Sequence, residues 1–506
     1  MRRMKLIAAL AAGMIFCAGA ETFEDITVEI EGKTYTYIMT DSDEDIAAWL
    51  YDYDCRMPAI EELRPNPELS PNVIAKMEEL GVCWSATADA YVLNYYTPEK
   101  GAYIIFLYDL DTDTELIYAV RNNDTKKIKQ LLSAGVDVDE RNISGSTALM
   151  WAAYCDNAKM MQLLMDAGAE VNAKDDYGFT ALMVAAEKGN TKTMKLLIKA
   201  GAEVNAKRNN GVTALMAATA NNSAKAINLL LKSGADVNAK DNDGVTALIA
   251  AAANNSAKAI PLLIKAGADV NAKDEDGYTA LMNVACYDSA KAIPLLIKAG
   301  ADVNTKAEEG FTALMVAAGY DSAKAIPLLL KAGADIDAKG EDGATALMFA
   351  AINDSTKAIP LLIKAGADVN AKNEDGYNAL MEVACYDNAK VIQMFVNAGA
   401  DVNAQNYEGM TALMYAATEN AADAAKLLIA SGADVNAKNN KGMTTLMLAA
   451  LENAVDVAKL LIDAGADVNV KRDDGDTALD IARKVGSVET EKVLSEYTEG
   501  ILKAMP

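Results

Sequence analysis

The feature that most constrains this chain is a tetrapeptide that recurs every 33 residues without an insertion. Thr-Ala-Leu-Met or a close variant begins at Thr147, Thr180, Thr213, Thr246, Thr279, Thr312, Thr345, Asn378, Thr411, Thr444 and Thr477. One further step back reaches Thr114, which opens a degenerate first copy. A fixed period of this length is the signature of stacked structural repeats. The sequence therefore predicts about 12 repeats, which we number 1 to 12 from Thr114 to Thr477.

Each repeat predicts two short helices and a turn. The threonine suits a helix N-cap, and the Ala-Leu-Met-x-Ala-Ala that follows it is rich in strong helix formers. A second cap position lies ten residues later, and it holds Asp124, Asn157, Asn190, Ser223, Ser256, Ser289, Ser322, Ser355, Asn388 and Ser487, with Ala421 and Ala454 as exceptions. A glycine such as Gly267 then ends the second helix, and Asp-x-x-Gly forms a turn. Helices this short need stacked neighbours to be stable.

Four repeats carry a proline five residues after the second cap position. These prolines are Pro261, Pro294, Pro327 and Pro360. Proline lacks a backbone N–H and clashes with the preceding turn of a helix. We therefore expect a mild kink or a late helix start in these repeats.

The repeat resembles that of the ankyrin family, in which a hairpin is followed by Thr-Pro-Leu-His-x-Ala-Ala, a second helix and Gly-Ala-Asp-Val-Asn. The resemblance covers residues 114 to about 495, with Ala and Met in place of the family's Pro and His, as at Ala181 and Met183. It implies a mainly α solenoid over residues 113–506, with polar first and last repeats as caps. It also implies that hairpin tips and first helices form a concave face that binds other proteins.

Residues 21–112 differ from the repeats and contain half of the ten prolines. Alternating apolar and polar residues predict a hairpin over 26–39 and a strand pair over 91–96 and 102–107. Helices are expected at 43–51 and 71–80, which makes a small α+β domain.

Part of this domain shows a looser resemblance. Within residues 50–107, Arg56-Met57-Pro58-Ala59-Ile60-Glu61-Glu62-Leu63 and Trp84-Ser85-Ala86-Thr87 are similar to a C-type-lectin-like domain of bacterial surface proteins. This resemblance implies a binding or structural module that contacts glycans or another surface.

The N-terminus predicts export. Arg2, Arg3 and Lys5 precede a short apolar stretch, and Ala18-Gly19-Ala20 offers a cleavage site, so residues 1–20 read as a signal peptide cleaved near Ala20. We expect a periplasmic or secreted protein. In such an oxidising compartment Cys55 and Cys83 are expected to form a disulfide, the alternative being two buried thiols. Repeat spacing keeps three further cysteines apart as free thiols: Cys155, Cys286 and Cys385.

The composition excludes several classes of partner and of catalytic site. The formal net charge is −25, which argues against nucleic acid and anionic membranes as partners. The chain contains no histidine, which excludes Ser-His-Asp and Cys-His catalysis and histidine-based zinc sites. We expect no cofactor and no metal, and a monomer that is soluble after cleavage.

Aromatic residues recur at two positions of the central repeats. They stand directly before the repeat threonine or eight residues after it, and the candidates are Phe179, Tyr278, Tyr287, Phe311, Tyr320, Tyr377 and Tyr386. Exposed on a concave face, such rings are typical interface anchors. The alternative is that they pack on neighbouring tips and stiffen the array.

The same repeats carry acidic hairpin tips, which are Glu275, Asp276, Glu308, Glu309, Glu341, Asp342, Glu374 and Asp375. Eight carboxylates on adjacent tips favour a partner with a basic surface, whose association they would accelerate. A merely solvated edge and a calcium site are the alternatives.

The sequence thus predicts a protein-binding scaffold outside the cytoplasm and no enzyme. One alternative is a surface adhesin or glycan-binding protein that uses residues 21–112 as a lectin-like module and the array as a spacer. Another is an enzyme in that domain, with the acidic run at Asp41, Asp43, Glu44 and Asp45.

Overall fold

The structure of the chain is a computed structural model, and it describes residues 26–30, 33–37, 82–85, 90–97, 101–107 and 113–504. The chain divides into two compact units, the N-terminal unit of residues 1–235 and the C-terminal unit of residues 236–506. Each is described by itself. Among the described residues, no helix is both long enough and apolar enough to cross a membrane.

Among its described residues, the N-terminal unit first contains five strands. Strands β1 (Ile26–Ile30) and β2 (Lys33–Tyr37) form an antiparallel pair, as the predicted hairpin requires. Strands β3 (Val82–Ser85), β4 (Ala90–Thr97) and β5 (Gly101–Leu107) form an antiparallel sheet in the order β3-β4-β5. The predicted strand pair corresponds to β4 and β5.

Several predictions for the N-terminal region lie outside the described residues. They are the signal peptide, the helices at 43–51 and 71–80, the acidic run from Asp41 to Asp45, and Cys55 with its disulfide.

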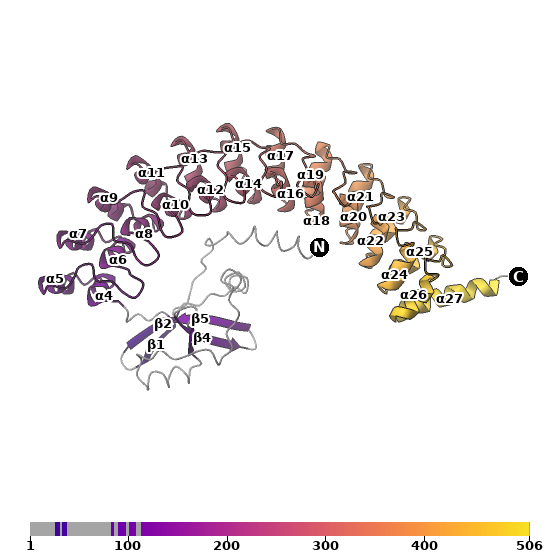
Figure 1. The fold of residues 1–506 in the computed structure, drawn as a ribbon, viewed down its shortest axis with the longest axis horizontal. Coiled ribbons are helices and arrows are strands. Elements are labelled where there is room, and N and C mark those ends of the chain that lie inside the picture. The colour runs from indigo at the N-terminus through magenta and orange to yellow at the C-terminus, as the bar shows by residue number, and fades with distance from the viewer. Residues whose placement is uncertain are drawn as a thin grey trace. The chain divides into compact units, whose positions relative to one another are not determined.

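The rest of the N-terminal unit consists of the helix pairs of repeats 1 to 4. These are α4 (Glu115–Arg121) with α5 (Thr125–Ser133), α6 (Ala148–Tyr154) with α7 (Ala158–Asp166), α8 (Ala181–Glu187) with α9 (Thr191–Lys199), and α10 (Ala214–Ala220) with α11 (Ala224–Lys232). Within the unit the first helices of the pairs form one row and the second helices another (Figure 1).

The C-terminal unit contains the helix pairs of repeats 5 to 12, arranged in two rows in the same way (Figure 1). They are α12 (Ala247–Ala253) with α13 (Ala259–Lys265), α14 (Ala280–Cys286) with α15 (Ala292–Lys298), α16 (Ala313–Gly319) with α17 (Ala325–Lys331), α18 (Ala346–Ile352) with α19 (Ala358–Ala365), α20 (Ala379–Ala384) with α21 (Ala389–Asn397), α22 (Ala412–Thr418) with α23 (Ala422–Ala430), α24 (Thr445–Leu451) with α25 (Val455–Asp463), and α26 (Ala478–Val485) with α27 (Val488–Ala504).

In most repeats the recurring tetrapeptide supplies both the cap and the core of the first helix, although the Thr147 side chain makes no cap bond. In repeat 6 the Thr279 hydroxyl accepts a hydrogen bond from the Met282 N–H at 3.4 Å, as an N-cap should. Leu281 and Met282 are each 1% exposed. Burying a side chain of this kind contributes about 1.5–3 kcal/mol. The methionine that replaces the family's histidine is therefore part of the core.

The four proline repeats start their second helix late, which confirms that alternative of the prediction. Helix α13 begins at Ala259, three residues after Ser256, whereas α11 begins one residue after Ser223. Pro261 is thus the third residue of its helix. The N–H groups of a first turn have no partner within the helix, so the proline removes no helical hydrogen bond there.

The late start also corrects four predicted caps. The residues that precede these helices are lysines, namely Lys258, Lys291, Lys324 and Lys357, and not Ser256, Ser289, Ser322 and Ser355. Two of the serines bond to the preceding repeat instead. The Ser322 hydroxyl donates to the Cys286 carbonyl at 3.0 Å, and the Ser355 hydroxyl donates to the Gly319 carbonyl at 3.2 Å.

Capping of these helices comes from the repeat before. Asp321 has a left-handed backbone with φ of 54°, and its carboxylate accepts the N–H groups of Lys357 and Ala358, both at 2.8 Å. Asp288 accepts the corresponding N–H groups of repeat 7 at 2.6 and 2.8 Å. In repeats 7 and 8, a residue between the two helices of the preceding repeat therefore caps the second helix.

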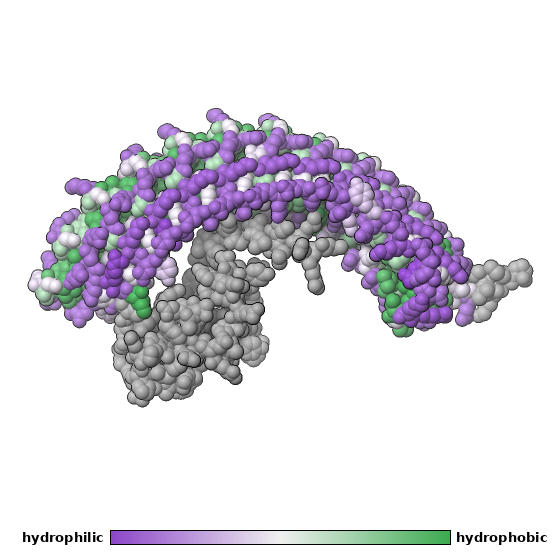
Figure 2. Space-filling view, viewed as in Figure 1, coloured by the Kyte–Doolittle hydropathy of each residue, from purple (hydrophilic) through white to green (hydrophobic). Residues whose placement is uncertain are grey.

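Successive hairpin tips of the C-terminal unit are joined by backbone hydrogen bonds. The N–H of Glu308 donates to the Asp276 carbonyl at 2.9 Å, and the N–H of Glu341 donates to the Glu309 carbonyl at 2.9 Å. Beside this row, the Lys306 ammonium group donates to the Lys339 carbonyl at 2.8 Å. Hydrophilic residues accordingly run in bands along the unit (Figure 2).

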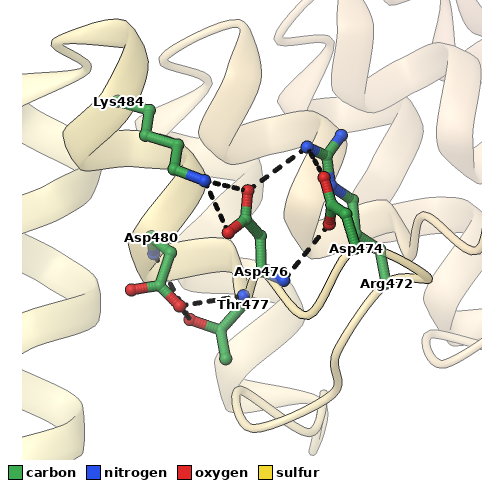
Figure 3. Close-up of polar contacts among 6 residues, drawn as sticks. All are labelled: Arg472, Asp474, Asp476, Thr477, Asp480 and Lys484. Atoms are coloured by element: carbon green, nitrogen blue, oxygen red, sulfur yellow. Dashed lines mark hydrogen bonds and ion pairs between the residues drawn. The ribbon is translucent and has the colours of Figure 1, made fainter.

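The last hairpin is held by an ion-pair network (Figure 3). Asp476 pairs with Arg472 at 3.2 Å and with Lys484 at 2.5 Å, and Arg472 also pairs with Asp474. Next to it, Asp480 accepts the Thr477 N–H at 3.0 Å while its own N–H donates to the Thr477 hydroxyl at 3.3 Å. These contacts fix the polar terminal repeat that the sequence predicts as a cap.

Candidate protein-binding face

Three of the predicted partner-binding tyrosines meet in repeats 6 and 7. Tyr278 precedes the first helix of repeat 6, Tyr287 ends α14, and Tyr320 ends α16. Burial is the largest cause of the raised pKa of Tyr320, and Cys286, Tyr278 and Tyr287 all lie near enough to add to it. These four side chains come from two repeats whose first helices, α14 and α16, pack on each other, and Tyr320 is still 42% exposed.

The cluster is uncharged at neutral pH. Burial raises the pKa of the Cys286 thiol to about 11 and the pKa of Tyr287 to about 12. A thiol with such a pKa is a weak nucleophile, because the thiolate is the reactive form. Cys286 is a packing residue here, as the sequence predicts, and it is one of three free cysteines among the described residues.

A second group forms around Tyr386 in repeat 9. This tyrosine is 42% exposed, and its hydroxyl donates to the Ile352 carbonyl of the preceding repeat at 2.7 Å. Cys385 beside it has a pKa raised to about 12, by burial first and by the carboxylates of Glu382 and Glu419 second. Burial also raises the pKa of Glu382, which the sequence analysis did not single out.

Phe311 and Tyr377 instead pack on the next repeat. The Phe311 ring lies 4.9 Å from the Phe349 ring, and the Tyr377 ring lies 5.4 Å from the Tyr415 ring. The Tyr415 hydroxyl donates to the Tyr377 hydroxyl at 2.5 Å. These two half-buried rings match the stiffening alternative. Their partners share one position, four residues after the repeat cap, and that register is the signal that could have identified them.

Aromatic rings of the N-terminal unit carry cations. The Arg208 guanidinium lies 3.7 Å from the centre of the Phe179 ring. Likewise Arg121 lies 4.6 Å from the Trp151 ring, and Lys188 lies 4.6 Å from the Tyr154 ring. Phe179, the predicted partner residue of this unit, is thus covered by a side chain of the same chain.

The acidic tips lie mostly at the surface. Glu275, Asp276, Glu308, Glu309, Glu341, Glu374 and Asp375 are exposed. Asp342 is half-buried, and its carboxylate accepts the Ala344 N–H at 2.9 Å. Within the part of the chain that the structure describes, no three Asp, Glu or Cys side chains are grouped as a metal site. The calcium alternative gains no support from the geometry.

Six segments match a family model described as "Ankyrin repeats (3 copies)": residues 116–208, 206–274, 251–340, 281–373, 347–439 and 413–503. The chain belongs to the ankyrin-repeat family. Ankyrin repeats mediate binding to other proteins, so the array is a protein-interaction scaffold. No curated protein matches the chain significantly. The lectin-like resemblance of residues 50–107 is not confirmed and stays a prediction.

The ankyrin array also has a groove that the sequence analysis missed. Its volume is about 810 Å³, and Gly340 lies on its wall, where most other repeats carry Asp, Asn or Arg. Most of the side chains that line it are polar or aromatic, among them Lys306, Asp337, Lys339, Asp368, Lys372, Glu374 and Tyr407. Only Glu374 among these is a predicted partner-binding residue.

Proposed function

We propose that this ankyrin array binds another protein outside the cytoplasm, through the face formed by residues 278–386. The observation that carries the proposal is the group of Tyr278, Tyr287 and Tyr320 on two repeats whose first helices pack on each other, with Tyr278 and Tyr287 half-buried and Tyr320 42% exposed. Large aromatic side chains that are partly exposed at the centre of a face are the residue type that dominates interface energetics.

The acidic tips support the same face. Four adjacent repeats place exposed carboxylates beside the aromatic residues, as at Glu275, Glu308 and Glu374. Charges around an apolar centre accelerate encounter with a partner of opposite sign and exclude partners of the same sign. A basic partner surface follows from this arrangement.

Export is the second part of the proposal. It rests on the basic residues, short apolar stretch and Ala-Gly-Ala site of residues 1–20. The test is the N-terminal sequence of the mature protein after cell fractionation. We expect a chain that begins at Glu21 in the periplasm or the medium. A chain that retains Met1 in the cytoplasm contradicts this part and leaves the binding face untouched.

Crosslinking in intact cells, followed by mass spectrometry, tests the binding face. The triple variant Tyr287→Ala, Tyr320→Ala and Tyr386→Ala should lose the captured partner. The matched control removes three exposed tyrosines elsewhere, with Tyr118→Ala, Tyr177→Ala and Tyr497→Ala, and should keep it. Equal capture by both variants, each folded by circular dichroism, refutes the mapped face.

A further inference from the structure

An aromatic residue at the position before the repeat threonine has different neighbours in the two units. In the N-terminal unit the ring of Phe179 lies under the guanidinium of Arg208, which stands 29 residues later in the next hairpin. Two further rings of that unit, Trp151 and Tyr154, also have a cation within 4.6 Å of the ring centre. These three rings occupy three different repeat positions, and a cation from an adjacent repeat lies above each of them.

The C-terminal unit does not supply these cations. A step of 29 residues leads from Tyr278 to Ala307 and from Phe311 to Gly340, so neither ring has a basic side chain at the position of Arg208. The position of Lys188, eight residues after the repeat threonine, holds Tyr287, Tyr320 and Tyr386 in repeats 6, 7 and 9.

Carboxylates surround the tyrosines instead. The charged groups that act on Tyr278 are Glu309, Asp274 and Asp276, which add to burial in raising its pKa. Those that act on Tyr386 are Glu382, Asp354 and Glu419, again after burial. Each of these carboxylates, when ionised, favours a neighbouring positive charge. In the described residues, the face thus combines aromatic rings with an excess of negative charge.

This combination of aromatic rings and carboxylates favours a positively charged ligand. A cation above an aromatic ring gains from the negative face of the ring, and nearby carboxylates add to that gain. Packed repeats lie about 8–10 Å apart, and an extended peptide advances about 3.3 Å per residue. Three residues of an extended peptide therefore span about the distance between two repeats. A segment with a basic residue at every third position would place one cation at each repeat.

We propose that the face formed by Tyr278, Tyr287, Tyr320, Glu382 and Tyr386 receives an extended basic segment of a partner protein, with Lys or Arg side chains on successive tyrosine rings. The proposal rests on the proposed function and specifies its ligand. On Tyr278, a partner cation takes the place that Arg208 takes on Phe179 in the N-terminal unit.

Fluorescence anisotropy with labelled peptides and the full chain tests the proposal. The probe has four Arg-Gly-Ser triplets. A first control replaces each Arg by Gln, and a second has the same composition with all four Arg in one block. We expect saturable binding of the spaced probe, at least about fivefold tighter than the blocked peptide, because only the spaced probe reaches several rings. The Gln peptide should not bind. Equal affinity for the spaced and blocked peptides overturns the proposal.

Variants separate ring contact from net charge. Ala307→Arg should place a guanidinium on Tyr278, as Arg208 lies on Phe179, and weaken the spaced probe about fivefold. Arg208 and Arg472 occupy the same repeat position, so the fold accepts arginine there. Ala290→Arg adds the same charge at an exposed site on the second-helix side of repeat 6 and should have less than a twofold effect. Equal weakening by the two variants reduces the effect to overall charge and overturns the proposal.

A second pair of variants tests ring contact independently, in case Ala307→Arg does not fold. Tyr320→Leu removes the ring and should weaken the probe about fivefold, whereas Tyr320→Phe keeps the ring and should bind within about twofold. Indistinguishable affinities for these two variants contradict ring contact. If the peptides fail while crosslinking still captures a partner through this face, the inference falls and the proposed function stands.

Discussion

The N-terminal and C-terminal units share one repeat but use its aromatic positions in opposite ways. In the N-terminal unit Phe179 is covered by Arg208, a residue of the same chain. In the C-terminal unit Tyr278 occupies the same position, and Ala307 stands where Arg208 would be. The comparison teaches that one side chain in the following hairpin decides whether a cation of the same chain covers the ring. Substitutions in the structure that the two units share should have the largest effects on stability, and substitutions where the units differ should have smaller effects.

The largest effect should come from the common core. Leu149 in repeat 2 and Leu281 in repeat 6 are each 1% exposed at the same repeat position. Leu149→Ala and Leu281→Ala should each lower the free energy of unfolding by about 2–5 kcal/mol. Urea denaturation followed by circular dichroism measures both. A difference well beyond that range would break the view that the two units differ only at their surfaces.

The cap between repeats should have the next largest effect. Asp321→Gly removes the carboxylate that accepts the N–H groups of Lys357 and Ala358, while glycine tolerates the positive φ. The loss should be about 1–2 kcal/mol. Asp321→Asn is the matched control, because Asn453 accepts the Thr490 N–H at 3.1 Å at the equivalent place. An asparagine variant as unstable as the glycine variant would argue for a role of charge.

Removing a cation from the N-terminal unit should cost less. Arg208→Gln leaves a side chain of similar length over Phe179 but removes the charge 3.7 Å from the ring centre. We expect a loss of about 0.5–1 kcal/mol in the free energy of unfolding. The spaced arginine probe should also gain a weak site in this unit. Unchanged stability at low and high salt would show that the cation contributes nothing there.

The smallest effect concerns pH. Burial raises the pKa of Asp274 from 3.8 to about 6, although its carboxylate accepts the Tyr278 N–H at 2.7 Å. The folded state therefore holds this proton more tightly than the unfolded state does. Stability from this group is highest below about pH 4, falls as the pH rises towards 6, and stays lower above 6.

Asp274→Asn should remove that loss. Asn373 makes the equivalent bond to the Tyr377 N–H at 2.9 Å, so the amide suits the hairpin. Because Asp274 is half-exposed, the gain at pH 7 should stay below about 1 kcal/mol after solvent screening. Thermal unfolding at pH 4 and pH 7 measures it. A variant that is stabilised equally at both pH values would rule out the ionisation of Asp274 as the cause.

The sequence predicted the repeat, its two helices and the late start in the proline repeats, because each follows from local capping and proline chemistry. It assigned Ser322 and Ser355 as caps, whereas the cap comes from Asp288 and Asp321 of the preceding repeat. Such bonds join residues 36 or 37 positions apart and leave no local signal.

The candidate site was predicted only in part. The tyrosines were identified from their register, and the structure brings Tyr278, Tyr287 and Tyr320 together. The packing of Phe311 on Phe349 could not be foreseen, because it depends on a ring in the next repeat. Glu382 was missed because a single carboxylate in a helix has no pattern of its own.

Capping by the preceding repeat gives the array a direction. The second helix of repeat 8 takes its cap from Asp321, whereas the second helix of repeat 7 needs nothing from repeat 8 for its cap. A cut between repeats 7 and 8 would therefore leave the second helix of repeat 8 without this cap and would take no cap from repeat 7. An array that begins at repeat 8 should fray at that helix. A repeat of this kind placed after repeat 7 instead finds its capping carboxylate already present.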